Sequence, residues 1–140
     1  MSKIISIDDC VFTIEEKDSV KKTGYTRKTT YDGWIIKTES ETIKVGIDNE
    51  PSCCEEWGHV TTMDSPDEFI GAHLYGIKIT DTKLKEVPLP KSMDNGFGVM
   101  FVTFSTSKGD FQLVTYNDHN GYYGHESVVV SRDLVHSEIL

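Results

Sequence analysis

The sequence predicts a mainly β fold (α+β), an antiparallel sheet or half-barrel built from hairpins with one short helix. Apolar and polar residues alternate with a period of two in several segments, which is typical of strands with one buried face. Short polar or glycine-containing links join these segments, and such links favour hairpins and therefore antiparallel pairing. The chain has 140 residues, including 6 Phe, 6 Tyr and 2 Trp. This is enough apolar material for one core, so we expect a single domain over residues 1–140.

The alternation predicts a run of strands along most of the chain. In residues 42–48, for example, Ile43, Val45 and Ile47 alternate strictly with other residues. Strands are predicted at residues 4–7, 11–17, 31–39, 42–48, 58–63, 74–80, 99–105, 111–116 and 126–130. Residues 17–28 are polar and basic with no period, which indicates a loop or a wide, exposed hairpin turn.

Three short links predict which strands pair. Residues 39–41 and 108–110 each separate two strand-like segments and favour hairpins. Asn120-Gly121 is the strongest short hairpin signal in the chain, and it predicts that residues 111–116 pair with residues 126–130.

The short helix is predicted just after residues 58–63. Asp64 or Ser65 is a suitable N-cap, Pro66 suits the first turn, and Gly71 ends the helix after about one and a half turns. Residues 83–98, with two prolines and two glycines, indicate an irregular connection, and residues 133–140 a final helical turn or a frayed end.

The charge of the chain restricts its partners. Asp and Glu total 23 against 14 Lys and Arg, a net charge of −9. Such a surface repels nucleic-acid phosphates and anionic lipid, so we expect no direct nucleic acid and no membrane among its partners. It suits a basic protein partner, although acidity can also serve solubility alone. Because the sequence has no run of about 18 apolar residues and no signal-peptide core, we expect a cytoplasmic protein.

Residues 49–59 concentrate the groups that could bind a metal. Cys53, Cys54 and His59 lie close together in the sequence, and thiolate with imidazole is the ligand mixture that zinc prefers. The remaining ligand would come from a distant segment, for which the histidines around Asn120-Gly121 are the candidates. The sequence therefore predicts a structural zinc site of Cys53, Cys54, His59 and His119.

The predicted hairpin bears on which histidine joins that site. In a two-residue turn at Asn120-Gly121, His119 and His125 point to opposite faces of the ribbon, so only one can contribute. His119, nearer the tip, is preferred over His125. Two other interpretations of Cys53 and Cys54 stay open, namely buried structural cysteines and reactive thiols. Cys54, His119 and Asn117 could be named as a catalytic set, but no cysteine-hydrolase signature surrounds them. Cys10 is interpreted as a buried filler.

Four short motifs carry a family resemblance. Ser52-Cys53-Cys54-Glu55, Asp67-Glu68-Phe69-Ile70-Gly71, Thr106-Ser107-Lys108-Gly109 and Asn120-Gly121-Tyr122-Tyr123 occur in this order. Together they resemble a family of small uncharacterised proteins from phages, prophages and their hosts, catalogued as a domain of unknown function. The resemblance covers about residues 51–130 and implies no activity. A small, acidic phage-type protein is also similar in size and charge to the anti-CRISPR proteins with which phages block a host nuclease.

We therefore expect a phage-encoded acidic inhibitor, and not an enzyme. It would bind a host defence nuclease of the type II CRISPR class through protein–protein contact in the host cytoplasm, and carry a structural zinc. Two alternatives stay open. The first is a small metal- or thiol-dependent enzyme working at Cys54 and the nearby histidines, and the second is a phage accessory or structural protein.

Overall fold

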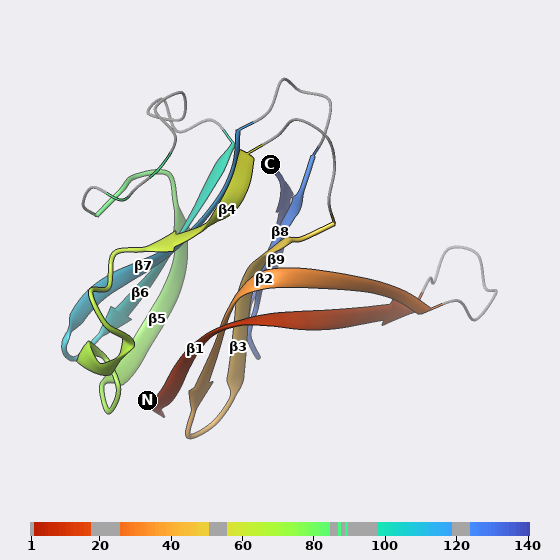
Figure 1. Cartoon of the computed structure of the whole chain (residues 1–140). Coiled ribbons are helices and arrows are strands. Elements are labelled where there is room, and N and C mark those ends of the chain that lie inside the picture. The colour runs from red at the N-terminus through yellow and green to blue at the C-terminus, as the bar shows by residue number, and fades with distance from the viewer. Residues whose placement is uncertain are drawn as a thin grey trace.

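The computed structural model describes residues 2–17, 26–50, 56–84, 87, 89, 98–118 and 124–140. Nine strands form one continuous antiparallel sheet in the order β4-β7-β6-β5-β1-β2-β3-β8-β9, so the mainly β prediction is confirmed (Figure 1). The strands are β1 (Ser2–Lys17), β2 (Thr26–Thr38), β3 (Thr42–Asp48), β4 (Glu56–Thr61), β5 (His73–Thr80), β6 (Val99–Thr106), β7 (Gly109–Asp118), β8 (Glu126–Val130) and β9 (Val135–Ile139).

The predicted short helix is wrong. In its place is a single 3-10 turn, η1 (Pro66–Glu68), in which Ser65 is the N-cap and its hydroxyl accepts from the Asp67 amide. The capping signals were sound, but the turn stops after three residues because Gly71 adopts a left-handed φ of 86° and returns the chain to β1. Among the described residues the structure has no α-helix and no helix long and apolar enough to cross a membrane.

Strand β1 divides the sheet into two halves that face each other. Its Ser2 and Lys3 pair with β5, whereas the rest of its length pairs with β2. Figure 1 shows β4–β7 on one side and β2, β3, β8 and β9 on the other. One apolar cluster lies between them, which includes Trp34, Ile36, Ile43, Val45 and Ile47 from one half and Met100, Val102, Phe104, Phe111 and Leu113 from the other.

The packing of the core explains why the alternation of apolar and polar residues predicted strand β3 correctly. Ile43, Val45 and Ile47 point inward from β3 and are fully buried, and the rings of Phe104 and Phe111 stack with centroids 4.8 Å apart. Burying such a side chain contributes about 1.5–3 kcal/mol. This burial energy also fixes the pairing register of a strand with one buried face, because a shift by one residue would turn all of its inward apolar side chains to solvent.

The hairpin predicted at Asn120-Gly121 is wrong. Strand β7 pairs with β4 and β6, whereas β8 pairs with β3 and β9, so the chain crosses from one half of the sheet to the other between them. Thr115 on β7 and Ser127 on β8 meet across the core through a buried hydroxyl contact of 2.6 Å. Burial of β7 and β8 in different halves overrides the local turn signal. The argument that placed His119 and His125 on opposite faces therefore loses its basis.

The C-terminal prediction of a helical turn or frayed end is also wrong, since residues 135–139 form strand β9. Val135 and Ile139 project to solvent, so the segment lacks the buried apolar face that marks other strands. Its backbone pairing with β8 fixes it instead, and this is not visible in the sequence pattern.

Strands β1 and β2 form a long hairpin whose far end projects from the rest of the molecule (Figure 1). The two strands predicted at residues 4–7 and 11–17 are one strand, because Asp8, Asp9 and Cys10 continue the ladder with β2. Strand β2 begins at Thr26, within the segment predicted as a loop at residues 17–28, of which residues 18–25 lie outside the described residues.

Candidate functional site

Of the four predicted zinc ligands, the structure describes only His59. Its Nε2 lies 2.9 Å from Asp9 Oδ1, and its ring meets Trp34 edge-on with centroids 4.7 Å apart. Strand β4 thereby contacts β1 and β2 on the far side of the core. Cys53, Cys54 and His119 lie outside the described residues, so the site stays a prediction. Among the residues that are described, no group of three or more His, Cys, Asp or Glu could hold a metal ion.

The strands do bring together the points from which the predicted ligand segments start. Glu56 begins β4 directly after residues 51–55, and Asp118 ends β7 directly before residues 119–123. Glu56 and Asp118 are cross-strand partners. Since paired residues on neighbouring strands lie about 4.5–5.5 Å apart, both segments leave the sheet at one place.

His125, the alternative ligand, is part of the packed interior. It is 1% exposed, its Nδ1 donates to the Asp48 carbonyl over 2.6 Å, and its ring stacks on Trp57 with centroids 4.9 Å apart. These contacts hold the start of β8 against the end of β3 and the start of β4. The arrangement gives His125 a packing role.

Cys10 is half-buried on β1, opposite Gly33. Burial raises the pKa of its thiol, and the negative charge of Asp8 raises it further. Because the thiolate is the reactive form, Cys10 is a poor nucleophile at neutral pH. The sequence predicted a buried filler here, whereas the Cys10 side chain is only half-buried.

A cleft lies at the other end of the molecule and was not predicted from the sequence. It has a volume of about 520 Å³ and lies between the β2–β3 turn, the β8–β9 turn and the start of β5. Its lining consists of Ser2, Thr38, Ser40, Glu41, Leu74, Tyr75, Gly76, Ile77, Ser131, Arg132, Asp133 and Leu134.

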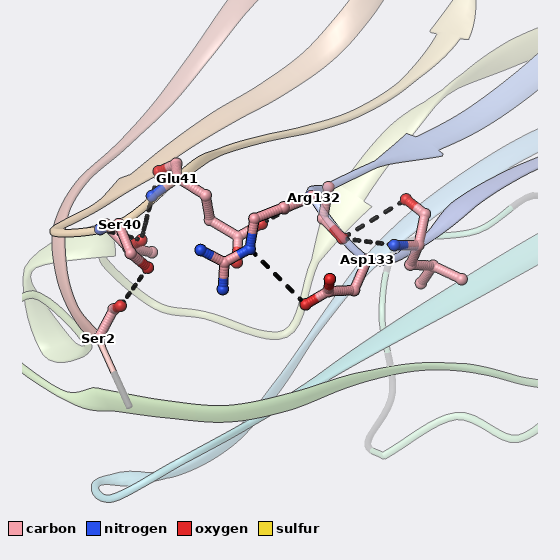
Figure 2. Close-up of polar contacts among 8 residues, drawn as sticks. Ser2, Ser40, Glu41, Arg132 and Asp133 are labelled. Carbon is pink, nitrogen blue, oxygen red and sulfur yellow. Dashed lines mark hydrogen bonds and ion pairs between the residues drawn. The ribbon is translucent and has the colours of Figure 1, made fainter.

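Hydrogen bonds fix the β2–β3 turn at the cleft, as Figure 2 shows. The Thr38 hydroxyl accepts from the amides of Ser40 and Glu41 at 3.2 and 3.1 Å. The Ser2 and Ser40 hydroxyls bond to each other, which ties the turn to the start of β1. One wall of the cleft is therefore ordered by short-range contacts before any ligand arrives.

The second wall, the β8–β9 turn, is joined to the first. The Arg132 amide donates to Glu41 Oε1 over 2.9 Å, and the Ser131 hydroxyl accepts from the Leu134 amide over 3.1 Å (Figure 2). The Arg132 guanidinium and the Asp133 carboxylate are exposed and 3.8 Å apart at their nearest atoms. Such an exposed pair contributes at most about 1 kcal/mol, so both side chains can turn toward a ligand.

The third wall is the edge of β5, which beyond Leu74 is unpaired among the described residues. Strand β1 pairs with β5 only through Ser2 and Lys3, which face Leu74 and His73. No other described strand runs along residues 75–80 on that side. The β5–β6 register shifts between Leu74 and Gly76, and Tyr75 is 58% exposed at this irregularity. An unpaired edge inside a cleft is an arrangement that accepts an extended peptide as an additional strand.

The chemistry of the cleft favours binding. Its lining offers hydroxyl groups, two carboxylates, one guanidinium and apolar surface from Leu74, Ile77 and Leu134. Among the described residues that line it there is no histidine or cysteine. The only sequence signal was Gly76 within a predicted strand, since glycine there often marks a bulge or a close backbone approach.

The chain belongs to a family described as a domain of unknown function, DUF7448, whose sequence model matches residues 3–129. No curated protein and no solved structure matches the chain.

Proposed function

We propose that the protein is a non-catalytic inhibitor that binds a basic protein through the cleft between β5 and the two turns. Its partner would be a host defence nuclease, specifically a type II CRISPR effector, and the chain would be phage-encoded. The observation that carries the proposal is the unpaired edge of β5 beside the Glu41 and Asp133 carboxylates. Backbone bonds to such an edge supply affinity for an extended segment, and the flanking carboxylates select lysine or arginine in it.

The charge of the whole chain supports the same partner. With a net charge of −9, the protein attracts a basic surface over a distance of about a Debye length. Nucleases present such surfaces because they bind nucleic-acid phosphates. The expected association is fast and weakens as salt concentration rises.

We also propose the structural zinc that the sequence predicts, held by Cys53, Cys54, His59 and His119. The pairing of Glu56 with Asp118 supports this site. Because these two residues are neighbours, the two segments that carry the predicted ligands begin at the same end of the sheet. To join, His59 would use the ring nitrogen that does not face Asp9. This metal would stabilise the end of the sheet away from the cleft and take no part in partner binding.

The test is DNA cleavage by a purified type II CRISPR nuclease at increasing concentrations of the protein. The parent should inhibit, and Glu41→Lys/Asp133→Lys should inhibit at least about tenfold less well, since each lost charge contact is worth about 1 kcal/mol. The matched control is Glu50→Lys/Asp81→Lys, which makes the same change of charge at exposed residues outside the cleft.

The two variants separate a local contact from a general charge effect. The control should lose less than about threefold, which is the long-range part of the attraction. Equal losses in both variants would show that the cleft is not the contact. No inhibition and no binding by the parent would refute the proposed partner.

A further inference from the structure

Strand β9 lies at one end of the sheet, and its backbone has a defined direction of hydrogen bonding. His125 and Leu140 exchange both backbone bonds, at 3.2 and 2.9 Å, and the Ser131 amide donates to the Leu134 carbonyl over 2.7 Å. In an antiparallel ladder such bonded pairs alternate with non-bonded ones. The N–H and C=O groups of Val135, Ser137 and Ile139 therefore point away from β8, toward the free edge.

The side chains of this edge strand are unusually apolar for their exposure. Val135 is 77% exposed and Ile139 is 72% exposed. Edge strands are commonly protected by charged side chains, proline or a bulge, and of these β9 has only Glu138. Strand β4, the other end of the sheet, contributes no large exposed apolar side chain among the described residues. Exposed apolar side chains thus distinguish β9 from the strand at the opposite end of the sheet.

The sequence of β9 is complementary to itself when read in the antiparallel direction. With a two-fold axis through Ser137, Val135 faces Ile139 of a second copy, and His136 faces Glu138 of that copy. Cross-strand apolar pairs and opposite-charge pairs are the ones that stabilise a sheet. His136 and Glu138 already lie 3.2 Å apart within the chain.

Neighbouring registers are less favourable. An axis through Glu138 places two carboxylates directly opposite each other, and an axis through His136 places two imidazoles opposite each other. Either choice also leaves two residues of β9 without a partner in the β9 strand of the second copy. Only the axis through Ser137 pairs the whole strand and brings all three outward-pointing residues into bonded positions.

We propose that a second copy of this chain covers the edge, so that two β9 strands pair about a two-fold axis at Ser137. Val135 with the second copy's Ile139, Ser137 with its counterpart, and Ile139 with Val135 each exchange two backbone bonds. The contact is isologous and closes after two copies, because it uses up the edge of both. This inference is independent of the proposed function, since the cleft is lined by other residues.

Sedimentation velocity over a wide concentration range tests the proposal. The parent should shift from monomer to dimer as concentration rises. Val135→Lys/Ile139→Lys places lysine opposite lysine at both ends and should weaken the dimer at least about tenfold. Val135→Lys/Ile139→Glu places lysine opposite glutamate at both ends and should dimerise nearly as well as the parent. Both positions are exposed, so all these chains should fold.

The lysine pair also makes the chain less acidic, so a lost dimer could not be attributed to net-charge repulsion. Ser137→Pro is an independent probe, because it removes an outward N–H and no bond to β8, and it should abolish the dimer. A parent that stays monomeric at every concentration would overturn the proposal. Dimerisation of the Lys/Lys variant like the parent, or equal weakening of both double variants, would overturn the Ser137 register.

Discussion

Gln112 is the residue at which the contribution of buried polar contacts to the stability of the fold is tested most directly. Gln112 lies on β7 and is 1% exposed. Its Nε2 donates to the Thr82 carbonyl over 2.8 Å and to the Thr103 hydroxyl over 3.0 Å, and its Oε1 accepts from the Leu84 amide over 2.9 Å. The Gln112 carboxamide thus hydrogen-bonds both to the segment that follows β5 and to the neighbouring strand β6.

Replacing Gln112 by Leu keeps the approximate volume and removes these three bonds together with a longer one of 3.4 Å from Nε2 to the Thr80 hydroxyl. A neutral hydrogen bond contributes about 1 kcal/mol, so Gln112→Leu should lower the free energy of unfolding by about 3 kcal/mol. Thr103→Val removes one of the Gln112 bonds and the 3.3 Å bond between the Thr103 and Thr80 hydroxyls, and it should cost about 1–2 kcal/mol. Urea denaturation followed by fluorescence of the buried Trp34 measures both values.

A third variant tests the donor role specifically. In Gln112→Glu the carboxylate can still accept from Leu84, but it faces the Thr82 carbonyl without a proton and is buried. The variant should be unstable at neutral pH and recover as pH falls, because the protonated acid restores a donor. If Gln112→Leu stays within about 0.5 kcal/mol of the parent, the polar contacts at this position do not stabilise the fold and the reasoning fails.

Three further predictions concern other parts of the structure. Burial and the hydrogen bond to Glu126 raise the pKa of Tyr31, so the native state holds this proton more tightly than the unfolded state. Stability should therefore fall as pH rises above about 10, by up to about 1.4 kcal/mol per pH unit, and Tyr31→Phe should remove this part of the slope in alkaline denaturation. Gly46→Ala should cost about 1–3 kcal/mol, because its Cβ would lie 2.8 Å from the Phe12 ring, whereas Gly76→Ala, with open space around it, should change the melting temperature little. Elemental analysis should find about one zinc per chain, lost in Cys53→Ser or Cys54→Ser together with a lower melting temperature; a metal-free parent would contradict the zinc site.

The sequence predicted the strands best where one face is buried. Residues 42–48 and 126–130 have the predicted bounds, because buried apolar residues mark both segments. Prediction failed for β9, whose apolar side chains face solvent, and for the Asn120-Gly121 hairpin, where packing in separate halves of the sheet overrides a local turn signal. Pairings such as β3 with β8 join residues far apart in the chain, and no local pattern specifies them.

The cleft was out of reach of sequence reasoning for the same physical reason. It is made where the β2–β3 turn, the β8–β9 turn and β5 meet, and each of these segments alone is an ordinary polar turn or strand. The sequence directed attention to cysteine and histidine, the residues with the most distinctive chemistry. Of these, His59 and His125 have packing and hydrogen-bonding partners inside the sheet.

Amide hydrogen exchange of the protein, alone and in complex with a purified type II CRISPR nuclease, tests the central claim most directly. If an extended segment of the nuclease adds to the free edge of β5, amides of residues 75–79 should exchange more slowly in the complex, together with those of the two turns beside Glu41 and Asp133. The projecting end of the β1–β2 hairpin should be unchanged. Protection confined to that hairpin or to another surface, with β5 exchanging as in the free protein, would contradict the account.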